Sequence, residues 1–148
     1  MRARRRNAVC LVLIGAALAN LLAYTVAYGV IGGDAPNGHT EAGGRYFIRG
    51  HFLKSSAGQE FEVSRGVWLY SYVHSISLWL SMGVVLLCML VLARPHILAT
   101  MPQHGASGPL TVWVLGLLMG LFCVIFAVMF VQNFVADLRI AAGAVPGG

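Results

Sequence analysis

Charged residues are scarce in this sequence. Only 10% of the 148 residues are Asp, Glu, Lys or Arg, whereas a soluble domain carries roughly 25%. Hydrophobic residues make up 58%, and the segments between the long apolar runs are too short to fold a separate soluble core. The composition indicates an integral protein of a lipid bilayer. It excludes a globular catalytic domain, a nucleotide-binding domain and a nucleic-acid-binding module.

Cysteine is also scarce, and catalytic motifs are missing. Cys10, Cys88 and Cys123 lie in or at apolar runs, without the short pair spacing of a thiolate metal site. The sequence has no zinc-protease motif, phosphate-binding glycine loop or Ser-His-acid arrangement, and four acids fall in the segment 33–65, which we expect to be exposed. We therefore expect neither a metal site nor an enzyme that acts on its own.

Three apolar runs are each long enough to cross a bilayer. They cover residues 8–32, 66–93 and 109–136, and about 20 apolar residues suffice to cross ~30 Å of hydrocarbon. Arg94-Pro95 is predicted to end the second helix. The predicted fold class is an all-α integral membrane protein with three transmembrane helices.

The N-terminal arginines predict the orientation. Arg2, Arg4, Arg5 and Arg6 precede the first run, and positive charges beside the first helix usually stay in the cytoplasm. We expect a single multi-pass membrane domain, 1–148, in the cytoplasmic (inner) or plasma membrane, with a cytoplasmic N-terminus and an outside C-terminus. Its connecting parts are an external loop 33–65, an internal loop 94–108 and a tail 137–148.

The first run also has the three-part pattern of a cleaved signal peptide. An arginine-rich start and an apolar stretch precede Ala17-Leu18-Ala19. Mainly apolar residues continue beyond Ala19 through Tyr24 to Ile31, and this continuity favours a retained helix over a cleaved one.

The external loop contains two strand-like segments. Residues 45–54 and 60–64 flank the turn-like segment 55–59, and they predict a short extracytoplasmic β-hairpin. The glycine-rich and polar segment 33–44 is predicted to be a flexible link.

The hairpin has an apolar face and a charged face. Phe61 and Val63 would share one face, because alternate side chains of a strand point the same way. On the other face, Glu60 and Glu62 could oppose Arg49, His51 or Lys54 across the strand pair. A lone hairpin is marginal in water, so we expect its apolar face to rest on the helix ends, on lipid headgroups or on another subunit.

Small residues recur at four-residue spacing in two of the runs. Helix association in lipid depends on close van der Waals contact, so these stripes predict packing faces, either within the chain or against a partner subunit. The stripes consist of Gly15, Ala19, Ala23 and Ala27 in the first run and Gly116 and Gly120 in the third.

The second run carries a polar arc that should avoid lipid. Gln132 and Asn133 of the third run fall at comparable depth, so a polar cluster is expected if the two helices are neighbours. The arc consists of Ser71, His74, Ser75, Ser77 and Ser81.

His74 is the residue of the arc whose side chain could serve the largest number of chemical roles. It could hydrogen-bond a serine, ligate haem or chlorophyll, contact a quinone or relay a proton. A haem held by two histidines of this chain is not expected, since the other runs contain no histidine.

These features predict an accessory or structural subunit that binds other membrane subunits. Respiratory and photosynthetic complexes are candidate hosts by analogy, since they contain many small subunits. One alternative is a cofactor-contacting membrane anchor that uses His74. Another is a small homo-oligomeric channel or transporter with the serine face lining a pore.

Overall fold

Three long helices dominate the computed structural model, which describes residues 2–51, 57–100 and 107–143. Helix α1 spans Arg2–Ile31, α2 spans Arg65–Thr100 and α3 spans Ser107–Ala141. All three are long and apolar enough to cross a membrane. The prediction of three such helices is confirmed, and it supports a multi-pass membrane protein.

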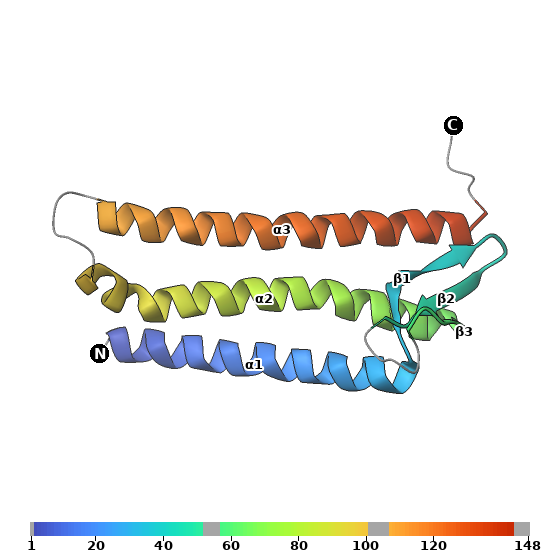
Figure 1. The fold of residues 1–148 in the computed structure, drawn as a ribbon, viewed down its shortest axis with the longest axis horizontal. Helices are drawn as coiled ribbons and strands as arrows, with labels where there is room; N and C mark the ends of the chain where they lie inside the picture. The colour runs from blue at the N-terminus through green and yellow to red at the C-terminus, as the bar shows by residue number, and fades with distance from the viewer. Residues whose placement is uncertain (1, 52–56, 101–106, 144–148) are drawn as a thin grey trace.

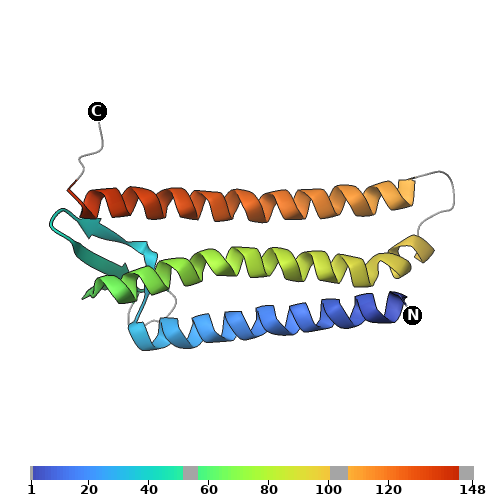
Figure 2. The same ribbon diagram turned by 180° about the vertical axis from the view of Figure 1, so that it is seen from behind.

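Helix α2 is the central element of the bundle. It packs against both α1 and α3, and the three helices run side by side along the length of the molecule (Figures 1 and 2). A small sheet covers one end of the bundle, called the sheet end below. The opposite end carries Arg4, Arg5, Arg6 and Arg94, and we call it the arginine end.

Two predicted helix ends were wrong. Arg94-Pro95 does not end the second helix, because α2 continues through Pro95 to Thr100. A proline inside a helix removes one backbone hydrogen bond and bends the helix, and the last turns of α2 turn away from its main axis (Figure 1). Helix α3 continues to Ala141, since Leu138 still packs against the core beneath the sheet.

The sheet has three antiparallel strands in the order β1-β2-β3, with β1 at Asp34–Glu41, β2 at Arg45–Arg49 and β3 at Glu60–Val63. The predicted hairpin is present as β2 and β3. Glu60 lies opposite Arg49 in the register, as expected, whereas Glu62 lies opposite Phe47 and not opposite a positive residue. Residues 52–56, including Lys54 and the start of the predicted turn, lie outside the described residues.

Strand β1 corrects the prediction of a flexible link at 33–44. Its sequence is polar and contains Pro36 and Gly38, so composition gave no sign of a strand. The strand lies at the edge of the sheet and its register shifts between Asp34 and His39. Proline is tolerated in such edge and irregular positions, and β1 is fixed by contacts with the helices.

Aromatic side chains join the sheet to the helices. Trp68 is fully buried, and its ring centroid lies 5.2 Å from that of Tyr46, 4.9 Å from Tyr72 and 5.7 Å from Phe134. Ile48 of β2 is also fully buried in this cluster. The hairpin therefore rests on the helix ends, one of the three predicted supports for its apolar face.

Candidate functional site

The polar arc of α2 meets α1 through one asparagine. Asn20 Nδ2 donates to Ser77 Oγ at 3.1 Å and to Ser81 Oγ at 2.9 Å. These are hydrogen bonds between two candidate membrane-spanning helices, where lipid offers no alternative partner. Asn20 and the two serines therefore fix the position of α1 along α2.

His74 lies beside this contact, and both of its ring nitrogens have protein partners. Nε2 is 3.3 Å from the backbone oxygen of Asn20, and Nδ1 is 2.9 Å from the hydroxyl of Tyr70. The Tyr24 ring meets the imidazole edge-on, with centroids 5.4 Å apart. A neutral imidazole has one donor and one acceptor, so Nε2–H to Asn20 and Tyr70 O–H to Nδ1 use both.

A cleft of about 490 Å³ adjoins this histidine. Asn20, Tyr70, His74 and Ser77 are the polar residues of its lining. Their polar groups bond one another, so a ligand atom on His74 would have to displace Tyr70 or the Asn20 carbonyl. This arrangement favours a structural hydrogen-bonding role for His74 over that of an axial ligand.

The remaining serines of the arc have other partners. Ser71 is buried and its Oγ accepts a hydrogen bond from the backbone nitrogen of Ala35 in β1, at 3.0 Å. Ser75 donates to the backbone oxygen of Ser71, at 2.9 Å. The arc is thus divided between α1, the sheet and its own helix.

The structure does not bring the amides of α3 into this cluster. Gln132 and Asn133 are exposed, and neither bonds α2 within the described ranges. Helix α3 contacts α2 through another polar residue, since Tyr72 donates to Asp137 Oδ2 at 3.0 Å. Thr40 of β1 donates to the backbone oxygen of the same aspartate, at 2.9 Å.

Sequence reasoning missed a second polar centre at the sheet end. Asp34 was expected in an exposed loop, but only 5% of its surface is exposed. Its carboxylate accepts from Tyr24 at 2.8 Å and from Asn37 at 2.7 Å, and lies 3.8 Å from His51 Nδ1. Asp34 thereby brings Tyr24, Asn37 and His51 together at the junction of α1 and β1. Only the position of Asp34, just after a helix that carries tyrosines, could have suggested this contact.

Most of the small-residue stripe of α1 does not face α2. Gly15, Ala19 and Ala23 are exposed and Ala27 is half-buried, because α1 turns a different side to its neighbour. Within the chain, the stripe is therefore not the packing face that one prediction proposed. Its contact with a partner subunit stays a prediction.

Close helix packing occurs instead between α2 and α3. A Cβ on Gly83 would lie 3.1 Å from Cys123 Cβ, and one on Gly116 would lie 3.3 Å from Leu90 Cδ2. Gly120 has open space around it. One of the two predicted glycines of α3 thus packs on α2, and Gly83 is an unpredicted contact.

Neither a search for metal-ligating clusters nor a comparison with known proteins assigns a function to this site. No group of three or more His, Cys, Asp or Glu side chains that could hold a metal occurs in the described part of the chain. Comparison with protein-family models, curated proteins and solved structures gave no match to this chain.

Proposed function

We propose that this chain is an accessory or structural subunit of a larger membrane protein complex. The observation that carries the proposal is the exposure of Gln132 and Asn133 on α3, within a candidate membrane span. Lipid tails cannot bond an amide, so polar side chains of membrane helices normally face protein or a water-filled space. A helix of a partner subunit would supply the missing hydrogen bonds.

The small-residue stripe of α1 supports the same proposal. Gly15, Ala19 and Ala23 lie on an exposed surface of α1 that neither α2 nor α3 covers within the described residues. Small side chains let two helix backbones approach closely, which strengthens van der Waals contact in lipid. The stripe on α1 and the two amides on α3 are therefore two separate exposed surfaces to which partner subunits could bind.

Copurification from native membranes tests the role of the amides. In mild detergent we expect the wild-type chain to migrate with other polypeptides, well above its own mass of 15.8 kDa. A hydrogen bond between membrane helices contributes about 0.6 to 2 kcal/mol. Replacing both amides, Gln132→Leu with Asn133→Leu, should lower partner recovery about tenfold, as measured by native gels and mass spectrometry.

Thr25→Val is the matched control. Thr25 is also exposed on a spanning helix, but its hydroxyl already bonds the Leu21 carbonyl at 2.9 Å, so its loss should leave partner recovery unchanged. Recovery of copies of this chain alone would contradict the proposal and favour a homo-oligomeric channel. A visible absorption band that disappears with His74→Leu would instead favour a cofactor anchor.

We further propose a cytoplasmic N-terminus and an outside sheet, in the cytoplasmic (inner) or plasma membrane. The arginine cluster supports this orientation. Ala42 and Thr100 are exposed at opposite ends, while the native cysteines are buried. In intact cells a membrane-impermeant thiol reagent should label Ala42→Cys and spare Thr100→Cys. The reverse labelling pattern would overturn the orientation.

A further inference from the structure

The two ends of the bundle differ in charge. All five acidic residues of the sequence lie in the sheet or near the end of α3 beside it. The arginine end carries Arg4, Arg5, Arg6 and Arg94 and has no acid. A negatively charged ligand at this end would meet no acidic side chain of this chain.

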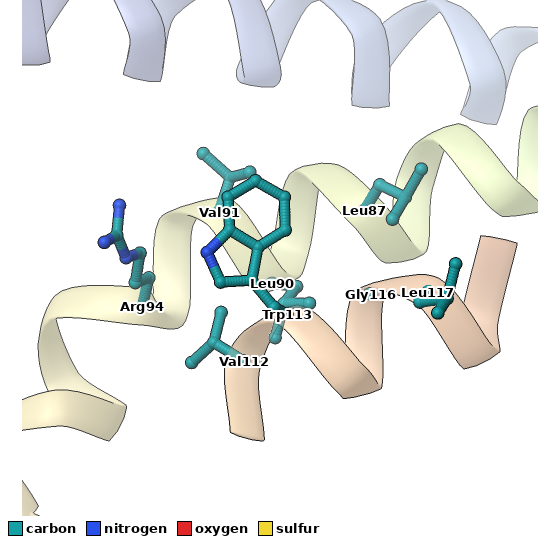
Figure 3. A pocket seen from close by; sticks show the side chains of 8 residues that line it. All are labelled: Leu87, Leu90, Val91, Arg94, Val112, Trp113, Gly116 and Leu117. Carbon is teal, nitrogen blue, oxygen red and sulfur yellow. The ribbon is translucent and has the colours of Figure 1, made fainter. Parts of the chain in front are cut away.

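An apolar cleft opens between α2 and α3 at the arginine end. Its volume is about 480 Å³, within the range of small-molecule sites. Leu87, Leu90 and Val91 line it from α2, and Trp113 and Gly116 from α3 (Figure 3). The absent side chain of Gly116 lets α3 approach Leu90 to near van der Waals distance there.

Arg94 is the charged residue of the cleft, and it lies at one end. Trp113 lies between Arg94 and Leu87 in Figure 3, so the lining runs from a guanidinium to purely apolar side chains. Leu87 and Arg94 are seven positions apart, which corresponds to ~10 Å along the helix. Arg94 is exposed and forms no ion pair within the described residues.

A second cleft, between α1 and α2, shares the lining residue Val91 with the first. It also has a volume of about 480 Å³, and Arg5, Arg6, Val9 and Cys10 complete its lining. Guanidinium groups from α1 and α2 thus border neighbouring apolar surfaces. An elongated amphiphile with one anionic group matches this distribution of charge.

We propose that the cleft between α2 and α3 binds an anionic phospholipid. Its acyl chain would lie along Leu87, Leu90 and Trp113, and its phosphate would pair with Arg94. Arginine binds phosphate through two parallel hydrogen bonds, and basic pockets between membrane helices are typical sites for anionic headgroups. The depth order fits, because Arg94 is closer than Leu87 to the end of the bundle.

Trp113 provides the signal for a test, because it lines the cleft and is 76% exposed. The full chain is placed in phosphatidylcholine vesicles with rising fractions of brominated phosphatidylglycerol or brominated phosphatidylcholine, whose bromines quench nearby indoles. Subtracting the signal of Trp113→Phe isolates this residue. We expect brominated phosphatidylglycerol to reach half-maximal quenching at a membrane fraction about fivefold lower than brominated phosphatidylcholine. A preference of about fivefold is what one arginine near an anionic headgroup contributes.

Arg94→Gln should remove this preference and leave equal quenching by the two lipids. Arg139→Gln is the control, because it removes one positive charge at the sheet end, distant from the cleft. Equal quenching in the wild-type protein would overturn the proposal, as would an unchanged preference in Arg94→Gln. Absence of quenching by either lipid would also overturn it, since another protein surface would then cover the cleft.

Discussion

Replacing Trp68 by alanine is expected to lower the free energy of unfolding by about 3 to 5 kcal/mol, the range for removing a large buried aromatic side chain. The indole is fully buried and contacts rings from β2, α2 and α3. Its loss leaves a cavity where the sheet rests on the helices. Thermal unfolding in detergent should show the loss, together with faster hydrogen exchange in β2.

Trp68→Phe separates ring packing from hydrogen bonding. Trp68 Nε1 is buried without a hydrogen-bond partner among the described residues, and a buried unpaired donor is costly. Phenylalanine keeps an aromatic ring and removes that donor, so we expect a change within about 1 kcal/mol of wild type. A loss as large as that of the alanine variant would mean that the indole nitrogen has an essential partner.

The helices and the hairpin could be predicted because their signals are local. An apolar run of sufficient length needs a helix to pair its backbone in lipid, and each of the three runs forms one. Alternation placed Phe61 and Val63 on one face, and their register partners are the buried residues Ile48 and Tyr46. Neither inference required knowledge of distant contacts.

Strand β1 could not be predicted because distant residues hold it in place. Ala35 bonds Ser71, and Thr40 bonds the backbone of Asp137, which is 97 positions away. Local composition, with Pro36 and Gly38, indicates a link. The contacts that override this preference depend on how α2 and α3 are arranged beneath the sheet.

The polar site was predictable as a set of residues but not as a set of pairs. Two serines of the arc around His74, Ser71 and Ser75, are buried within the protein. Helical periodicity defines an arc but does not say which neighbour faces it, and Asn20 of α1 occupies the place expected for the amides of α3. Which helix faces the polar arc depends on how α1 and α3 are rotated about their own axes. The repeat of small residues did not specify that rotation.

Gly38→Ala is expected to separate β1 from β2, because the space for a Cβ is already occupied by backbone. The added atom would lie 2.0 Å from the Phe47 carbonyl oxygen and 2.8 Å from Ile48 Cα. Backbone atoms in a paired strand cannot rotate away as a flexible side chain can. We expect a loss of about 3 kcal/mol, the upper end of ordinary overpacking.

Hydrogen exchange is the measurement for Gly38→Ala, because the three helices should persist while the sheet opens. Amides of β1 and β2 should exchange faster, and the bonds from Ala35 to Ser71 and from Thr40 to Asp137 should weaken with them. Gly29→Ala is the control, since its Cβ would meet nothing within 4 Å and alanine favours a helix. Unchanged protection in β1 and β2 of Gly38→Ala would contradict the close approach of Gly38 to Phe47, and with it the pairing that holds the sheet on the bundle.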